Sequence, residues 1–467
     1  MTALTDWIRA LPQRYGKRTL IALAVIAALG LFVRAYVVVD PVEHPGDDSR
    51  AYYALSKALY EEQSFGGSEF EDSSDWSPGA PFLYAAAFYA TGGPREGTAR
   101  IVEALLGVAS ILVVFALGWR LGGRVHGRWA GLFAAFAVAV YPPFIHSTGV
   151  IMSEPPAMFT LPAAILAFLW AADRERSANP DLPGVRGRPW PWLVPGFLFG
   201  LTALFRPEYL FVAAAFVVLA AVRIARGRGW RPGLAGGAVF LIALALPILP
   251  WTVRNYIVLD KVVPISTGGG KALYVGTYLP ADGEYQRVKA DLAERYLGRN
   301  LEPGSPALDA IDPTPLFDRV AEEGHPGLPR DEALGKVGKE NFEKYFGEDP
   351  LGYMAMTVRK VWRMWSSGVG EAMSSTPGRV VQVLLVLLGL AGFALLGLRR
   401  RWLEFLALAT PIAIITAIGA VSLAPPRRNE VLMTLVFPLA ALALSSGLAA
   451  ISSGREWSSE QASSPPN

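Results

Sequence analysis

The sequence predicts an all-α membrane protein that crosses the bilayer many times. Of its 467 residues, 52% are hydrophobic, which is above the share found in ordinary soluble domains. Apolar runs close to 20 residues long, the length that a transmembrane helix needs, recur along the chain. Arginine clusters follow alternate runs, as is typical of loops on one side of a membrane. We therefore expect about ten transmembrane helices, with further helices in the loops.

The expected spans are the long apolar runs between charged or turn-forming segments. The fifth and sixth runs are short and close together, so they either merge or tilt. Pro81–Ala90 is too short to cross and is expected to lie in the interface. The runs are Arg18–Val39, Arg100–Arg120, Trp129–Ile145, Ser153–Ala172, Trp190–Phe205, Tyr209–Val222, Leu234–Ile257, Val380–Leu398, Leu403–Ser422 and Val431–Ile451.

The positive charges predict the orientation. In a model with ten spans, all the arginine-rich loops fall on the side of the N-terminus, which the positive-inside rule makes cytoplasmic. The first outer loop, 40–100, is instead rich in aspartate and glutamate. The net charge of +3 gives no support for nucleic-acid binding. The basic loops include Arg120, Arg124, Arg128, Arg174, Arg176, Arg223, Arg226, Arg399, Arg400 and Arg401.

The chain divides into four parts. Residues 1–257 form an N-terminal transmembrane module that includes the loop 40–100, and 258–379 form a helical region on the outer face. Residues 380–451 add the C-terminal spans, and 452–467 form a polar tail that we expect to be disordered and cytoplasmic. The chain has no cysteine, which excludes disulfides and thiol chemistry.

Helical periodicity is also present outside the spans. In the outer loops it predicts helices over Ser49–Tyr60, Gly283–Leu297, Pro329–Phe346 and Pro350–Trp365. The last of these combines tryptophan and methionine with arginine and lysine, a pattern suited to the membrane interface.

The candidate site lies at the outer ends of the spans. Asp47 and Asp48 follow the first span, where a carboxylate can take a proton from an acceptor hydroxyl. A sugar phosphodiester leaves as an anion, so its departure needs cations and no general acid. A single base, together with positively charged side chains that bind the departing phosphate, would therefore replace the two carboxylates that glycosidases use. The other candidates are Glu154, Arg206, Arg254, Asn255, Lys271, Arg427 and Arg428.

Each candidate also has a structural interpretation. The acid pair fits a solvated turn, Glu154 favours a helix N-terminus, and Arg206 can pair with Glu208 in a tight turn. Arg254 and Asn255 can anchor a span end in the interface.

Two further motifs are weaker signals. Gly268-Gly269-Gly270-Lys271 lacks the full phosphate-loop motif, which leaves at most a looser cradle for a lipid phosphate. A metal shared by His44, Asp47, His146 and Glu154 has no supporting ligand spacing, so no metal or other cofactor is predicted.

Four segments carry a family resemblance: GDDSRAYYALSKAL, YPPFIHSTGVIMSEP, ALFRPEYLF and PWTVRNYIVLDKVVPISTGGGKALYVG. In this order they resemble membrane glycosyltransferases of the C-type superfamily, and most closely bacterial family 39, which is related to protein O-mannosyltransferases and lipid A aminoarabinose transferases. The resemblance covers roughly 18–450 and implies an aspartate base in the first outer loop. The spacing to Tyr52, Ser56 and Leu59 favours Asp48 over Asp47. Gly276-Thr277-Tyr278 departs from the Gly-Asn that is frequent in the family.

The resemblance implies an inverting glycosyltransferase of the bacterial plasma membrane. It would move a sugar from a polyprenyl-phosphate donor to an envelope glycan, lipid or protein on the outer face. The alternatives are a transporter or flippase of a lipid-linked saccharide and a non-catalytic scaffold. A transporter is expected to show paired halves and polar groups at the midplane. Here the loops are unequal and the polar candidates lie near one face.

Overall fold

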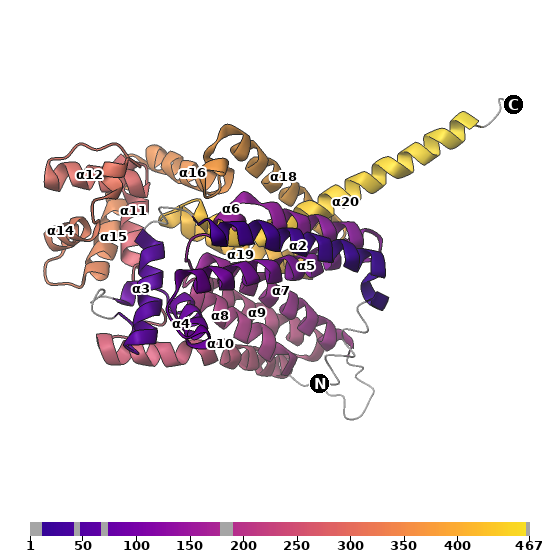
Figure 1. The fold of residues 1–467 in the computed structure, drawn as a ribbon, viewed down its shortest axis with the longest axis horizontal. Helices are drawn as coiled ribbons and strands as arrows, with labels where there is room; N and C mark the ends of the chain where they lie inside the picture. The colour runs from indigo at the N-terminus through magenta and orange to yellow at the C-terminus, as the bar shows by residue number, and fades with distance from the viewer. Residues whose placement is uncertain (1–11, 42–46, 67–72, 178–189, 464–467) are drawn as a thin grey trace.

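The computed structural model describes residues 12–41, 47–66, 73–177 and 190–463. Every regular element in these ranges is helical, and the long apolar helices run side by side as a bundle (Figure 1). Eight of them are long and apolar enough to cross a membrane. These are α2 (Lys17–Val39), α5 (Glu96–Val140), α7 (Glu154–Ser177), α9 (Tyr209–Arg228), α10 (Trp230–Leu259), α18 (Thr376–Leu398), α19 (Trp402–Val421) and α20 (Arg427–Ser463). The all-α polytopic fold is confirmed.

Helix α5 accounts for two of the expected spans because it is a hairpin. Gly123 has φ 63° and ψ −151°, a conformation that breaks the helix and that glycine adopts without the strain of a Cβ atom. Small residues let the two arms pack closely: a Cβ on Gly118 would lie 2.7 Å from the carbonyl oxygen of Ala130. The turn at Gly123 therefore places Arg120, Arg124 and Arg128 together at one end of the bundle.

The short fifth and sixth runs remain separate helices. η2 (Trp190–Trp192) leads into α8 (Leu193–Phe205), and α8 packs against α10. Arg206 and Pro207 then break the helix before α9 begins at Tyr209. This break brings Arg206 and Glu208 to the end of the bundle that also carries the first long loop.

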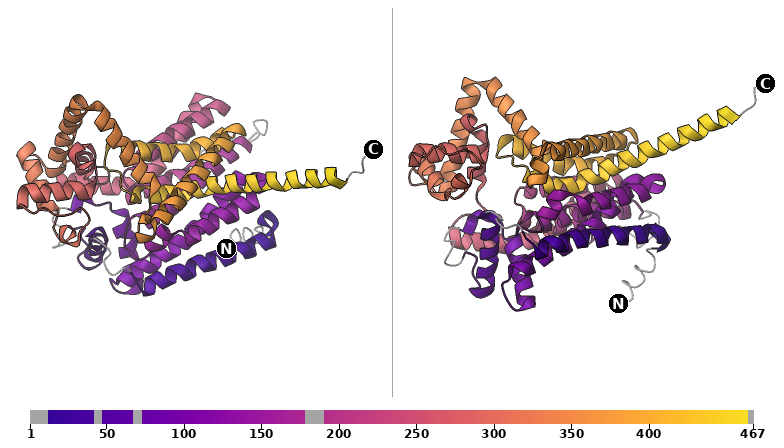
Figure 2. Two further views of the ribbon diagram at one scale, coloured as in Figure 1. Left: turned by 90° about the horizontal axis from the view of Figure 1, so that it is seen from above. Right: turned by 45° about the horizontal axis from the view of Figure 1, so that its top comes forward.

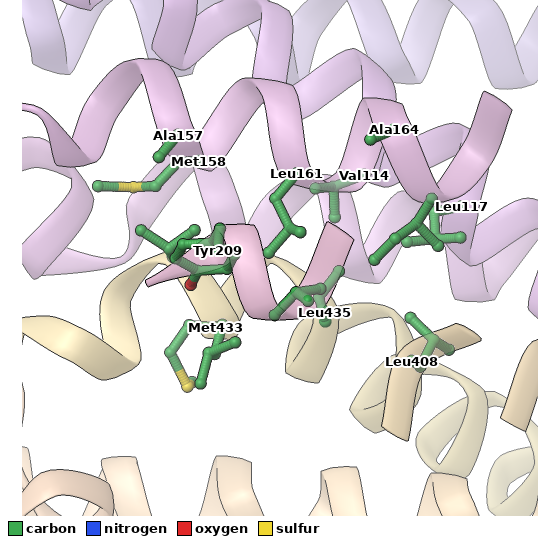
Figure 3. Packing of buried hydrophobic residues seen from close by; sticks show 14 of the residues in the cluster. Val114, Leu117, Ala157, Met158, Leu161, Ala164, Tyr209, Leu408, Met433 and Leu435 are labelled. Atoms are coloured by element: carbon green, nitrogen blue, oxygen red, sulfur yellow. The ribbon is translucent and has the colours of Figure 1, made fainter. Parts of the chain in front are cut away.

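The interior of the bundle is apolar and closely packed. Figure 3 shows Val114 of α5, Leu161 of α7 and Leu435 of α20 meeting in one cluster. α7 and α20 are largely enclosed by other helices, whereas α2 lies at the rim and exposes apolar side chains. Such an exposed apolar surface is what a lipid-facing helix presents.

Two groups of loop helices cover one end of the bundle. α3 (Asp47–Glu61) and α4 (Gly79–Thr91) pack on each other in the first loop, with η1 (Ser73–Asp75) between them. The larger group lies at the same end (Figures 1 and 2). It surrounds a separate core that includes Val288, Phe317 and Leu334. It contains α11 (Gly269–Thr277), η3 (Leu279–Ala281), α12 (Tyr285–Leu297), α13 (Pro306–Asp309), α14 (Thr314–Gly324), α15 (Arg330–Glu348) and α16 (Pro350–Ser366).

The expected loop helices are present with boundaries that differ by at most two residues. α16 begins where the sequence signals it: the Asp349 side chain accepts a hydrogen bond from the Gly352 amide at 2.9 Å, and Pro350 occupies the first turn. Helices α11 and α14 were not predicted. They are short, and their stability comes from packing against α15 more than from their own sequence.

The tail differs from the expectation of disorder. α20 continues to Ser463, so residues 452–463 are helical and extend away from the bundle (Figure 1). Adding residues to an existing helix needs no new nucleus, which explains why a polar segment can remain helical there. Two short helices complete the fold: α6 (Pro142–His146) precedes α7, and α17 (Glu371–Ser374) precedes α18.

Candidate active site

The first turn of α20 connects four parts of the molecule. Its side chains, Arg427, Arg428, Asn429 and Glu430, contact different elements. Arg427 donates to the carboxylate of Asp48 on α3. Arg428 donates to the hydroxyl of Ser422 at 3.2 Å.

The next two side chains of this turn are buried. Asn429 donates to the carbonyl of Ser367 just after α16, at 2.7 Å, and also to the carbonyl of Met364. Glu430 accepts from the hydroxyl of Ser147, just after α6, at 3.1 Å. The turn therefore fixes α3, α16 and the segment before α7 relative to one another.

Arg206 holds two carboxylates at the junction of α8 and α9. One of its Nη atoms lies 2.5 Å from Glu154, and the other lies 2.6 Å from Glu208. Burial alone would raise the pKa of Glu208, but the charges of Arg206 and Arg428 outweigh it and lower the pKa to about 2. Arg206 is thus a buried cation whose charge is balanced by the carboxylates of Glu154 and Glu208.

Asp48 remains ionised although it is surrounded by protein. Burial alone would raise its pKa, but Arg427, Lys271 and Arg206 outweigh that effect and lower the pKa below its usual value. The side chain is still 37% exposed, and that of Arg427 is 39% exposed. An incoming hydroxyl or phosphate can therefore reach both groups.

Lys271 contributes a fourth positive charge from the start of α11. Its ammonium lies over the rings of Phe317 and Tyr285, at 4.8 Å and 5.4 Å from their centroids. Burial lowers its pKa, while the negative charges of Asp48 and Asp75 act in the opposite direction.

The glycine-rich turn before Lys271 binds a protein carboxylate. The Lys271 amide donates to Asp331 of α15 at 3.1 Å, and the amides of Gly268 and Gly270 bond the same side chain. Asp331 thus caps the N-terminus of α11, where the sequence left open a cradle for a lipid phosphate. The ammonium of Lys271 is the part of this motif that faces the charges around Asp48.

Arg254 and Asn255 have a different set of partners at the end of α10. Arg254 donates to the carbonyl of Phe65 at 3.1 Å and lies 4.8 Å from the ring centroid of Trp251. Asn255 is fully buried and donates to the carbonyls of Val263 and Ile265 at 3.0 and 2.9 Å. The structure thus groups Asp48, Arg206, Arg427, Lys271 and Glu154. Arg254 and Asn255 are instead held by aromatic side chains and by the segment that follows α10.

Tyr52 connects α3 to the Arg206 junction. Its hydroxyl lies 3.1 Å from that of Ser77, which donates to the carbonyl of Phe205 at 2.8 Å. Burial and the charge of Glu154 raise the pKa of Tyr52, so it stays a neutral phenol. Tyr52 lies one helical turn beyond Asp48, which gives physical meaning to the spacing seen in the sequence.

Sequence reasoning missed several polar residues of this site. Asn429 and Glu430 directly follow the candidate pair Arg427 and Arg428, and Glu208 appeared only as a possible partner of Arg206. All three are polar residues at the ends of apolar helices, which is a usable signal because such groups are costly there unless they have partners.

The metal hypothesis receives no geometric support from the described residues. Among them, no three histidine, cysteine, aspartate or glutamate side chains lie close enough to hold an ion. His44 lies outside the described ranges, and Asp47 is described only as the first residue of α3. The site as described combines one accessible carboxylate with several fixed cations. This combination suits proton removal beside a departing anion.

Comparisons with known proteins give one family match and several structural matches. Residues 76–261 match the family model for dolichyl-phosphate-mannose-protein mannosyltransferase. A search of curated proteins finds no match. The residues matched by the model include α4, Glu154 and Arg206, so they cover part of the site.

Solved structures of an archaeal oligosaccharyltransferase share the fold. The oligosaccharyltransferase of Archaeoglobus fulgidus in its apo form is 19% identical with a TM-score of 0.57, over 96% of this chain and 52% of that one. The same organism's AglB, in complex with an inhibitory peptide and a dolichol-phosphate, is 17% identical with a TM-score of 0.53, over 98% and 53%. ArnT from Cupriavidus metallidurans bound to undecaprenyl phosphate is 14% identical with a TM-score of 0.39, over 90% and 77%.

The chain thus spans about half the length of the archaeal oligosaccharyltransferases that it resembles. The likeness therefore concerns the fold that carries the site, and not a whole enzyme. Residues 76–261 are thus similar to a mannosyltransferase family model, and the chain shares its fold with the archaeal oligosaccharyltransferases.

Proposed function

We propose that the protein is an inverting glycosyltransferase that takes a sugar from a polyprenyl-phosphate donor. The acceptor would be a glycan, lipid or protein of the cell envelope. The observation that carries the proposal is the Asp48–Arg427 pair, an accessible carboxylate and guanidinium in contact at the end of the bundle. A family model for a dolichyl-phosphate-mannose-dependent transferase and the dolichol-phosphate complex of AglB support the class of donor.

Asp48 is the proposed base. An inverting transfer needs a single carboxylate that removes the acceptor proton while the hydroxyl attacks the anomeric carbon. The lowered pKa keeps Asp48 ionised at neutral pH, so that it is ready to accept the proton. Glu154 and Glu208 are less suited to this task, because each is held by Arg206 and is more buried than Asp48.

Arg427, Lys271 and Arg206 are the proposed partners of the donor phosphate. The bond to the sugar breaks towards the phosphate oxygen, where negative charge develops in the transition state. Fixed cations near that oxygen stabilise this charge, and a guanidinium can grip two phosphate oxygens at once. All three lie close enough to Asp48 to lower its pKa, so they surround the place where base and donor must meet.

The same end of the bundle is the proposed outer face of the bacterial plasma membrane. The arginine-rich turns gather away from it: Arg401 donates to the carbonyl of Arg120, and Arg120 pairs with Asp173 at 2.5 Å. These residues end the second and fourth expected spans and precede the ninth. By the positive-inside rule this arginine-rich end is cytoplasmic, which leaves Asp48 outside.

The test is an assay of purified protein with a panel of polyprenyl-phosphate sugars, hexoses and pentoses, and an envelope extract as acceptor. We expect one donor to release polyprenyl phosphate and to yield a product of inverted anomeric configuration. Retention of configuration would contradict the single-base mechanism. Movement of intact donor across proteoliposomes without bond cleavage would show the alternative, a transporter or flippase.

A further inference from the structure

A buried lysine lies where the loop helices meet the last two spans, and it has no part in the mechanism proposed above. Lys360 of α16 is 1% exposed. Its ammonium donates to the carbonyl of Gly276, in the last turn of α11, at 2.6 Å, and to that of Ser422, which directly follows α19, at 3.2 Å. The last carbonyls of a helix have no partner within the helix and carry partial negative charge. One ammonium therefore caps the ends of two helices that are far apart in the chain.

The two helix ends also touch through their backbones. The linker between α19 and α20 comprises residues 422–426, and the amide of Leu423 within it donates to the carbonyl of Ala272 in α11 at 2.9 Å. A Cβ on Gly276 would lie 2.5 Å from the amide nitrogen of Leu423, closer than real Cβ atoms come to other atoms. A side chain at 276 would therefore push α11 away from the linker.

The ammonium is held at this junction at a cost in stability. A second glycine, Gly283, leaves room for the lysine stem, because a Cβ there would lie 2.5 Å from Lys360 Cδ. Burial and the positive charges of Arg363 and Arg428 outweigh the attraction of Asp282 and lower the pKa of Lys360 to about 8. Below that pH the charged amine favours the unfolded chain, where lysine titrates near 10.4. A buried charge of this kind can be retained because it enforces one specific arrangement.

Two cations of the proposed phosphate site are attached to this junction. Lys271 lies in the first turn of α11, and Arg427 directly follows the linker. The next residue, Arg428, donates to the hydroxyl of Ser422 at 3.2 Å. The charges of Lys271 and Arg427 both act on Asp48. The spacing between these two cations therefore depends on how α11 is seated on the linker.

We propose that Lys360 is a positioning residue that sets the spacing of Lys271 and Arg427 around the donor phosphate. This inference rests on the proposed transferase function. Without the ammonium, two sets of carbonyls with like partial charge would face each other, and α11 would move away from the linker. Lys271 would then lose its contact with a phosphate held by Arg427. Asp48 is held by Arg427 itself, so the base and the acceptor should be affected less than the donor.

The first arm of the test measures the junction and needs no activity. Hydrogen exchange at the Leu423 amide should be slow in the wild type and at least roughly tenfold faster in Lys360→Met, because that amide bonds α11 across the junction. Lys339→Met makes the same replacement at an exposed lysine of α15 and should leave the exchange unchanged. Rapid exchange in the wild type, or equal protection in Lys360→Met, would overturn the inference.

The second arm measures the effect on the donor, with the polyprenyl-phosphate sugar that the panel identifies. In Lys360→Met the donor KM should rise roughly tenfold, as for the loss of one charge-assisted contact, while the half-saturating concentration of the envelope extract stays within about threefold. Gly276→Ala keeps the lysine but displaces α11, so it should raise the donor KM as well. Loss of folded protein alone lowers the amount of active enzyme and changes neither value. An unchanged donor KM, or an equal rise of both values, would contradict a positioning role.

A double variant tests whether Lys360 acts through Lys271. When Lys271→Met is already present, adding Lys360→Met should raise the donor KM by less than about threefold, because the side chain that it positions is gone. A further tenfold rise would overturn the inference. If neither Lys360→Met nor Gly276→Ala folds, exchange at the Leu423 amide of the wild type decides. If the wild type transfers no sugar, the proposed function fails, whereas the exchange comparison still tests the junction.

Discussion

Arg427, in the first turn of α20, donates a hydrogen bond to the carboxylate of Asp48 in α3, 379 positions away in the sequence. The contact joins the first loop of the chain to its last span. It keeps the proposed base ionised and places a guanidinium where a donor phosphate must approach. The pair thus unites the two functions that a phosphate-sugar transferase needs, proton acceptance and anion stabilisation.

The pH dependence of the reaction should report this pair. In the free protein the pKa of Asp48 lies below the ordinary aspartate value of about 3.9. The acid limb of kcat/KM should therefore lie below about pH 4. Arg427→Gln removes the main positive neighbour, and the limb should move to higher pH. The measurement is a pH–rate profile of both proteins with a saturating acceptor. Coincident acid limbs would show that Arg427 does not control the charge of Asp48.

The two arginines at span ends should behave differently. Arg206→Ala should weaken donor affinity by roughly tenfold or more and Arg206→Lys by less, because an ammonium cannot grip two phosphate oxygens. Arg254 contacts Phe65 and Trp251, so Arg254→Ala should lower thermal stability and leave donor affinity unchanged. Donor affinity is measured on folded, detergent-purified variants. If Arg254→Ala alone lost donor affinity, the side chains that bind the donor phosphate would lie at the end of α10 instead.

The orientation can be checked by cysteine labelling, because the chain has no cysteine of its own. Glu322→Cys, exposed on α14, should react with an impermeant thiol reagent in intact cells. Val125→Cys, at the α5 turn and 80% exposed, should react only after the cells are permeabilised. The reverse pattern would place Asp48 on the cytoplasmic side.

Lys360 should make stability depend on alkaline pH. It is 1% exposed, donates to the carbonyls of Gly276 and Ser422 at 2.6 and 3.2 Å, and has its pKa lowered by burial to about 8. In the unfolded chain a lysine titrates near 10.4, so between about pH 8 and 10 the unfolded state binds more protons than the folded one.

The free energy of unfolding should therefore rise with pH over this interval, relative to Lys360→Met, which lacks the titrating amine. The measurement is thermal unfolding of both proteins at pH 7, 8.5 and 10. Parallel pH profiles would show that the burial of this amine does not perturb its titration.

Much of the fold could be predicted from the sequence because each span has its own apolar run. The predicted runs coincide closely with the observed helices, and the short run Trp190–Phe205 corresponds to η2 and α8. The helices α11 and α14 could not be predicted, because they depend on packing against α15 more than on a local pattern. The hairpin turn at Gly123 was predicted only as a gap between two runs.

The sequence indicated the candidate residues of the site, but it did not indicate which of them lie in contact. Asp48, Arg206, Glu154, Lys271 and Arg427 were all candidates, but no periodicity links positions 48 and 427. The capping of α11 by Asp331 was likewise invisible, because it joins residues 60 positions apart. Sequence indicates which polar groups are unusual for their surroundings, whereas only the fold shows which of them meet.

The most direct test of the central claim is turnover and donor affinity measured together on Asp48→Asn, with Glu61→Gln as an exposed control on the same helix. A general base contributes roughly 10²–10⁴-fold, so Asp48→Asn should lose that much turnover while it keeps donor affinity, and the control should match the wild type. If Asp48→Asn keeps wild-type turnover and Asp47→Asn is inactive, the base is Asp47. Wild-type turnover in both variants would contradict the mechanism.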